Sequence, residues 1–324
     1  MIRLAGSDEA GPSVAAPSAT PWSSPPRCLA VDRPRPSSLT ALLLEAPCPA
    51  VSVAGLLRAR CRIEDAVSGV AGAPPLHIDR FRLGSCGPGP TVSPGRPFVP
   101  GPATLRRAVG LDAVDRCHRG RVATPAAAVA DVLAGAADTG HGAPWWAPAW
   151  AALDIGSRAA VQAAAVAWAS RLWCGLDWAA LGPSAVVATR GERWRCRAAD
   201  WLTVHGRVDV RVGGAHPAGD AWLVVLGGVA PEHWLPLLGL PALVAALSRG
   251  PAAAAGRVVG WWPDTDQVRV CAVDDATVQV TAGAVAAVAE QWWRAERPVP
   301  GGPARPGGHG RRHPLNVQRR GRSA

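Results

Sequence analysis

Apolar and polar residues alternate between positions 202 and 212, with the two-residue period of a β-strand. One side of this predicted strand is apolar and consists of Leu202, Val204, Val208, Val210 and Val212. The other side is polar or charged and consists of Thr203, His205, Arg207, Asp209 and Arg211. Glycine and proline within 213–220 predict a turn, and the run 222–226 that follows is apolar on both sides. The pattern therefore predicts a hairpin whose second strand is central and covered on both faces.

Further helix and strand patterns lie on both sides of this hairpin. Residues 157–178 carry an apolar stripe at helical spacing, and helices are also predicted over 233–247 and 277–294. Residues 257–262 and 268–273 predict a second hairpin. The order helix, strand, strand, helix, strand, strand, helix is typical of an α/β fold, here a mixed central sheet flanked by helices.

The remaining patterns divide the chain into four segments. Residues 1–38 are rich in proline and serine and are predicted to be disordered. Residues 39–140 are predicted to form a mainly helical N-terminal region, in which Thr124-Pro125 marks the start of one helix. The α/β domain follows over 141–297. The arginine-rich tail 298–324 is again predicted to be disordered.

Composition narrows the chemistry that the chain can offer. Its 34 basic residues are all arginine, it has no tyrosine, and 15 tryptophans supply most of the large aromatic side chains, as expected from a GC-rich genome. Without lysine there is no phosphate-binding loop of the Walker type and no Schiff base. No GxSxG motif places a serine as a nucleophile.

The net charge of +10 is concentrated near the C-terminus, where residues 297–324 carry seven arginines and no acid. These include Arg311, Arg312, Arg319 and Arg320. Such a tail is predicted to bind DNA without sequence preference. The alternative is that the tail only increases solubility.

The cysteines and the apolar runs bear on localisation. None of the eight cysteines forms a CxxC pair or a zinc-type group with histidine, which favours free thiols in a reducing cytoplasm. The N-terminus lacks the apolar core of a signal peptide, and no apolar run reaches membrane-spanning length. We therefore expect a cytoplasmic protein without membrane contact.

The order of these elements resembles a RecB-type domain of the PD-(D/E)XK nuclease superfamily, as found in high-GC actinobacterial sequences. The resemblance covers residues 157–294. Its motifs lie at 168–173 in the long helix, at 206–209 in the strand, at 231–233 before the next helix, and at 258–264 in the second hairpin. The resemblance implies a restriction-endonuclease-like fold.

In active members of that superfamily, a carboxylate on the first strand and an acid-x-lysine on the second hold a divalent metal, usually Mg²⁺. Asp209 matches the first carboxylate. The second strand has no acid and no lysine, because it reads Val224-Val225-Leu226 and then Gly227-Gly228. A catalytic metal site on Asp209 would therefore have to be completed by Asp220 or Glu232, which flank that strand.

Asp209 can also be interpreted as a structural residue. Arg207 and Arg211 lie on the same side of the predicted strand, so that an ion pair with arginine is the alternative to metal binding. This favours a pseudoenzyme without a cofactor, which binds DNA or a protein partner through Arg207, Arg211 and the tail. The alternatives are an active metal-dependent DNA nuclease with its site relocated around Asp209, and an interaction protein with no role in nucleic-acid binding.

Overall fold

The structure is a computed structural model of the 324-residue chain. It describes residues 28–32, 36–45, 50–70, 73–84, 100–137, 143–188, 191–213 and 220–296. The arginine-rich tail, with Arg311, Arg312, Arg319 and Arg320, lies outside these described residues.

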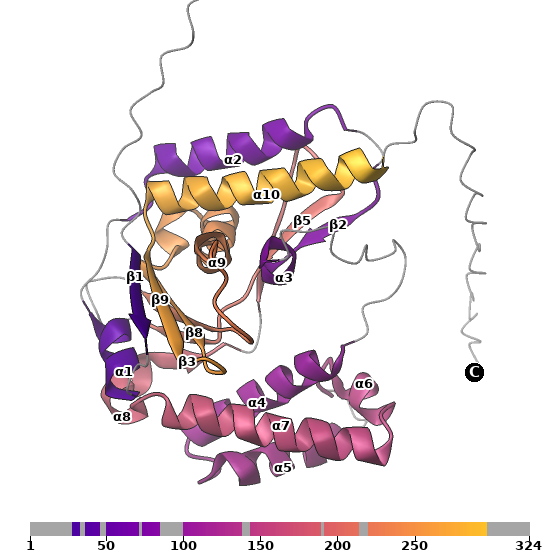
Figure 1. The fold of residues 1–324 in the computed structure, drawn as a ribbon, viewed down its shortest axis with the longest axis vertical. Coiled ribbons are helices and arrows are strands. Elements are labelled where there is room, and N and C mark those ends of the chain that lie inside the picture. The colour runs from indigo at the N-terminus through magenta and orange to yellow at the C-terminus, as the bar shows by residue number, and fades with distance from the viewer. Residues whose placement is uncertain are drawn as a thin grey trace, which may run out of the picture.

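A mixed six-stranded sheet forms the centre of the fold and has helices on both faces (Figure 1), which confirms the predicted α/β class. In sheet order its strands are β1 (Cys28–Asp32), β9 (Gln267–Ala272), β8 (Arg257–Trp262), β7 (Ala221–Val225), β6 (Val210–Val212) and β3 (Ala185–Val187). Only the β7–β8 pair of this sheet is parallel. A smaller sheet has the order β2 (Leu76–Ile78), β5 (Leu202–Gly206) and β4 (Glu192–Arg195).

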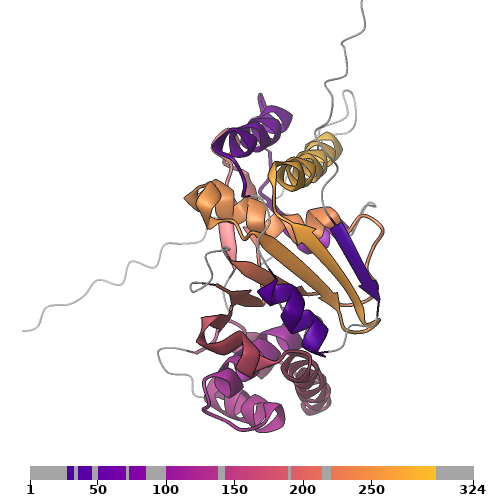
Figure 2. The same ribbon diagram turned by 90° about the vertical axis from the view of Figure 1, so that its left-hand side faces the viewer.

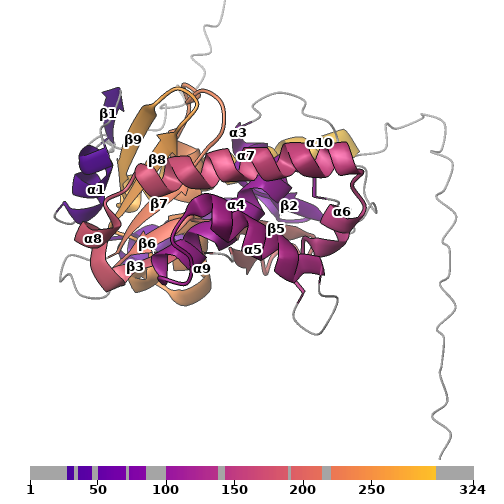
Figure 3. The same cartoon turned by 90° about the horizontal axis from the view of Figure 1, so that it is seen from below.

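The two faces of the central sheet are covered by different helices, as Figures 1 and 2 show. One face packs against α2 (Val53–Val67), α9 (Leu235–Arg249) and α10 (Asp275–Glu296). The core on the other face contains residues of α1 (Pro36–Leu44), α4 (Pro102–His118), α5 (Pro125–Ala137), α6 (Ala147–Ala151) and α7 (Ile155–Cys174). Helix α5 packs on α4 and α7, and Figure 3 shows these three helices from that side. The remaining described helices are α3 (Arg80–Gly84), α8 (Trp178–Leu181), and the 3₁₀ turns Gly182–Ser184 and Pro251–Ala253.

Strand β7 shows why a central strand must be apolar on both sides. All five of its residues are buried. Trp222 and Val224 lie in the core on the α9 side, whereas Leu223 and Val225 lie in the core on the α7 side. The alternation of side chains along a strand thus supplies both cores from one short segment.

The predicted continuous strand over 202–212 is wrong, because the structure divides it between the two sheets. Strand β5 pairs with β4 in the small sheet, whereas β6 pairs with β7 in the central sheet. Val208 packs on the α9 side and Val210 on the α7 side, so these two valines do not share a face. The chain changes sheets at Asp209, whose N–H donates to the carbonyl of Leu223 at 2.9 Å.

The small sheet packs one of its faces directly on α9. A Cβ atom added to Gly206 would lie 2.9 Å from Cα of Pro241 and 3.0 Å from Cβ of Val244. Glycine therefore permits this close approach of strand and helix.

The N-terminal part of the chain does not form a core of its own. Cys28–Asp32, predicted to be disordered, forms strand β1 against β9. Helix α2 packs on α10, and β2 pairs with β5. Both cores therefore contain residues from before and after position 140, so the predicted division at 140/141 does not separate two packed units.

Candidate functional site

Asp209 lies where the chain passes from β5 to β6, and its side chain is 0% exposed. Its Oδ2 accepts the backbone N–H of Val225 at 2.7 Å. Nε of Arg107 on α4 donates to Oδ1 at 3.0 Å, and Nη2 of Arg107 contacts both carboxylate oxygens. The carboxylate is thus saturated by one fork-shaped guanidinium and one main-chain donor.

A second arginine supports this ion pair. Arg80, the first residue of α3, is 9% exposed, and its Nη1 lies 4.0 Å from Oδ2 of Asp209. The same Nη1 donates to the carbonyl oxygen of Val225 at 3.4 Å. Arg80 of α3 and Arg107 of α4 therefore both approach Asp209, which accepts a hydrogen bond from the last residue of β7.

A third arginine, Arg207, lies near Arg107 and Asp209, and one of its N–H groups makes no hydrogen bond. The buried Nε of Arg207 has no hydrogen-bond partner. Burial lowers the pKa of the Arg207 guanidinium, the neighbouring Arg107 adds to this lowering, and Asp209 and Asp112 oppose it. Arg207 is therefore a half-buried cation in surroundings that are already positive.

Asp112 of α4 is the other carboxylate in this group. Its Oδ2 accepts the indole N–H of Trp146 at 3.2 Å. Burial raises the pKa of Asp112 above its usual range, and the Trp146 hydrogen bond offsets part of that rise. Three guanidinium groups therefore face two carboxylates, one of which has a weakened preference for its charged form.

The sequence predicted an arginine partner for Asp209, but it pointed to the wrong arginines. Arg211 instead donates to Oε1 of Glu192 at 2.6 Å and lies over the ring of Trp222. Arg107 was missed because it lies about 100 positions away in the chain. The signal that could have revealed it is an arginine in the apolar stripe of α4, in which Leu111 and Val114 follow at helical spacing and are buried.

The predicted metal ligands are not brought together. The β6–β7 register pairs Ala221 with Val212, so Asp220 lies beyond the far end of the ladder. Asp209 is level with Val224, four residues from Asp220 and hence about 13 Å along the strand. Glu232 is exposed in the segment between β7 and α9.

These residues do not fit a magnesium ion. Mg²⁺ requires several oxygen ligands in octahedral order, and the Asp209 oxygens are already engaged by Arg107 and Val225. Among the residues that the structure describes, no group of three or more His, Cys, Asp and Glu could hold a metal ion.

The carboxyl ends of the parallel strands β7 and β8 meet next to this site. The N–H of Gly228 donates to Oδ2 of Asp264 at 2.9 Å, and Arg171 of α7 donates to Oδ1 at 2.9 Å. The Gly228 hydrogen bond lowers the pKa of Asp264, and Arg171 contributes to the lowering. In open α/β sheets this edge is the usual position of ligand sites.

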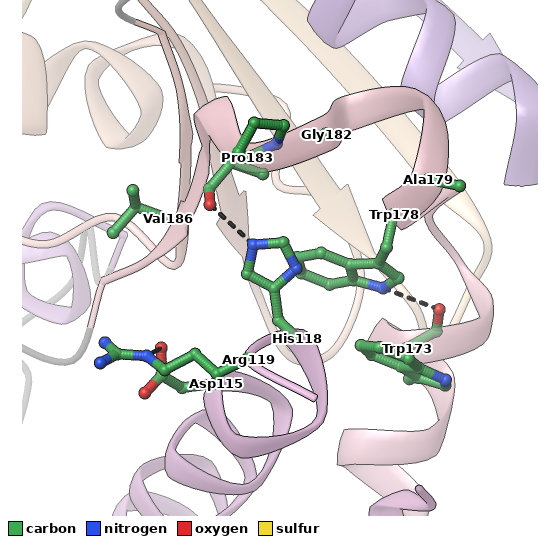
Figure 4. A pocket seen from close by; sticks show the side chains of 10 residues that line it. Asp115, His118, Arg119, Trp173, Trp178, Ala179, Gly182, Pro183 and Val186 are labelled. Atoms are coloured by element: carbon green, nitrogen blue, oxygen red, sulfur yellow. Dashed lines mark hydrogen bonds and ion pairs between the residues drawn. The ribbon is translucent and has the colours of Figure 1, made fainter. Parts of the chain in front are cut away.

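A pocket of about 610 Å³ lies at the other end of α4, beside the edge strand β3 (Figure 4). His118 reaches from α4 to β3, where its Nε2–H donates to the carbonyl of Ala185 at 2.8 Å. The ring of His118 lies 5.0 Å from that of Trp178, which is stacked on Trp173. His118 therefore covers a backbone acceptor of an edge strand, which protects that edge from pairing with another chain.

Comparisons with protein-family models, curated proteins and solved structures gave no significant match. Within the described residues, no helix is both long enough and apolar enough to cross a membrane.

Proposed function

We propose that this chain is a non-catalytic module with a nuclease-like sheet, which binds the phosphate backbone of nucleic acid through the arginine group around Asp209. The observation that carries the proposal is the saturation of Asp209 by Arg107 and the Val225 N–H. A carboxylate held in this way is not free to ligate a metal. Its role is to position guanidinium groups at the edge of the central sheet.

The excess of positive charge supports an anionic ligand. Arg80, Arg107 and Arg207 outnumber Asp112 and Asp209, and the Nε of Arg207 has no hydrogen-bond partner. A guanidinium offers a planar fork of N–H donors that matches phosphate oxygens. A phosphate that reaches the accessible part of the Arg207 side chain would reduce the repulsion between Arg207 and Arg107.

The resemblance to PD-(D/E)XK nucleases also supports a nucleic-acid ligand. In active members, a metal ion at the first-strand carboxylate supplies positive charge to the phosphate. In this chain, Arg107 contacts the matching carboxylate and supplies positive charge there instead. The proposal therefore retains binding of the backbone and omits cleavage.

The test uses a chain without 298–324, so that the tail cannot bind the probe. Labelled single-stranded and duplex DNA are incubated with it in EDTA, in Mg²⁺ and in Mn²⁺. We expect binding in all three conditions and no cleavage in any of them. Cleavage that disappears in Asp209→Asn would overturn the proposal in favour of a nuclease, and absence of binding in EDTA would overturn the binding role.

Arg207→Gln tests the site itself. Because Arg207 Nε has no hydrogen-bond partner, this substitution breaks no bond at that atom and should leave the fold intact. We expect it to weaken DNA binding several-fold. Arg211→Gln is the matched control from the neighbouring strand, since Arg211 is engaged by Glu192 and should contribute little to binding.

A further inference from the structure

The face of the small sheet that points away from α9 carries a row of arginines. In β4, Trp194 is buried, as is Cys196 just beyond the strand, whereas Arg193, Arg195 and Arg197 alternate with them and are exposed. Side chains two residues apart on a strand are about 6.8 Å apart. Arg193 and Arg195 thus stand on one side of the edge strand β4, and Arg197 follows in the bend just after it.

Two histidines lie next to this row, on the other two strands of the small sheet. His205 of β5 is opposite Arg193 in the β4–β5 register. Its Nε2 lies 3.1 Å from Nδ1 of His77 on β2. Burial lowers the pKa of His205, and His77 and Arg193 lower it further, while Asp79 opposes them. The histidine pair therefore lies beside one cation, Arg193, and one acid, Asp79.

Asp79, the acid near these histidines, caps the N-terminus of α3. Its Oδ1 accepts the backbone N–H of Phe81 at 3.0 Å and of Arg82 at 3.1 Å, which caps the start of α3. Its negative charge is therefore directed toward a helix N-terminus. Glu192 of β4 alternates to the other side of the strand, where it pairs with Arg211 and Arg249.

The Arg193 end of this row is the end nearer to the arginine group at Asp209. Arg207 follows His205 by two positions and belongs to that group. The β4–β5 register places Arg195 opposite Thr203 and Arg193 opposite His205, so Arg207 lies about 7 Å beyond the Arg193 end of the row. Arg207 also lies beside Gly191, which precedes β4, so Arg207 is placed between the β4 arginines and the carboxylate of Asp209.

We propose that the exposed arginine side of the edge strand β4 binds the backbone of a single-stranded nucleic acid, which runs along β4 toward Arg207. The inference rests on the proposed function and adds the path and the type of nucleic acid. The spacing of the arginines is comparable to the step between phosphates of an extended strand, and a sheet three strands wide measures only about 10 Å across. Trp194 and Trp201 point into the core, so binding should not depend on base identity.

The test compares two triple variants of the full chain, so that the tail contributes equally to both, with oligo(dT) as the probe and a series of salt concentrations. The first replaces Arg193, Arg195 and Arg197 by glutamine. Each lost phosphate contact lowers the slope of log K against log salt by about 0.7 for a single strand. We therefore expect a slope smaller by about 2, together with weaker binding at low salt.

The control variant replaces Arg58, Arg119 and Arg294 by glutamine. These arginines are exposed and lie on or just after other elements, namely α2, α4 and α10, so the same net charge is removed away from the small sheet. We expect its salt slope to remain close to that of the unsubstituted chain. An equal fall in both variants would overturn the inference, because net charge alone would then explain the binding.

Other outcomes separate this inference from the proposed function. If Arg207→Gln weakens binding but the β4 triple variant does not, the path is wrong while the proposed function stands. If the unsubstituted chain does not bind oligo(dT) or duplex DNA, both fail. Tighter binding to duplex than to oligo(dT) of equal length would overturn the single-strand assignment.

A spectroscopic measurement provides an independent check on the face. Bound phosphates would favour the charged imidazole, so the pKa of His205 should rise when oligo(dT) is added, as followed by the NMR shifts of its ring protons. An unchanged His205 titration at saturating oligo(dT) would contradict the inference. The same titration with the Arg193, Arg195 and Arg197 triple variant should show a smaller rise.

Discussion

The ion pair between Arg107 and Asp209 joins helix α4 to the centre of the fold, and its removal should be costly. Asp209 is 0% exposed and Arg107 is 11% exposed, so water cannot replace the lost partner when one of them is truncated. Breaking a buried pair from one side costs about 3–5 kcal/mol, because an uncompensated charge is left behind. Asp209→Ala also removes the acceptor for the Val225 N–H.

We therefore expect Asp209→Ala to lower the free energy of unfolding by about 4 kcal/mol. This is a large part of the roughly 5–15 kcal/mol that stabilises a typical domain. Arg107→Ala should cost a similar amount, because it buries an unpaired carboxylate. The double variant should cost less than the sum of the two, with a coupling energy of about 2 kcal/mol.

Urea denaturation followed by tryptophan fluorescence would measure these free energies. Arg211→Ala is the control, since its ion pair with Glu192 is partly exposed and should contribute less than about 1 kcal/mol. If the two single substitutions are additive, or if Asp209→Ala changes the stability by less than about 1 kcal/mol, the argument that Asp209 is a structural residue is refuted.

Three further predictions concern single residues. Burial raises the pKa of Asp112, so folding disfavours the charged carboxylate and the protein loses stability as the pH rises through the raised pKa of this group. Asp112→Asn cannot become charged, so it should gain stability over the wild type at pH 7 and gain less at pH 4, as measured by urea denaturation at both pH values. A variant less stable than the wild type at pH 7 would contradict this. His118→Ala removes the hydrogen bond to Ala185 and should lower the free energy of unfolding by about 1 kcal/mol. The substitution also exposes the β3 edge, so light scattering should detect more self-association than in the wild type. The Gly228 hydrogen bond lowers the pKa of Asp264, so the stability that this charged carboxylate contributes is present above the usual carboxyl range and is lost as the pH falls. Asp264→Asn should therefore flatten the dependence of the melting temperature on pH below pH 4. An unchanged pH dependence would contradict this prediction.

Most elements after residue 150 could be predicted from periodicity alone. The prediction of 257–262 for a strand agrees with β8, and the prediction of 277–294 for a helix lies within α10. The long helix predicted over 157–178 begins two residues earlier and ends at Cys174, where Gly175 follows. Such patterns are local, because a strand or helix must place its apolar side chains on the side that is buried.

The candidate site was predicted only in part. Asp209 was recognised because it is an acid within an apolar strand pattern, and an arginine partner was expected. The identity of that partner depended on how α4 crosses the sheet edge, and no pattern near Asp209 carries this information. The small sheet was missed for the same reason, since β2 and β5 are separated by more than 100 residues.

The sequence by itself determined the long helices and the central-sheet strands β7, β8 and β9, that β7 is enclosed on both faces, and that the second strand lacks an acid-x-lysine. Only the tertiary structure decided that the strand pattern breaks at Asp209, that Arg107 and Arg80 neutralise this carboxylate, and that Asp220 and Glu232 lie apart from it. The physical reason is that secondary structure follows from side chains a few residues apart, whereas charge pairing in a core depends on segments brought together only when the whole sheet is packed.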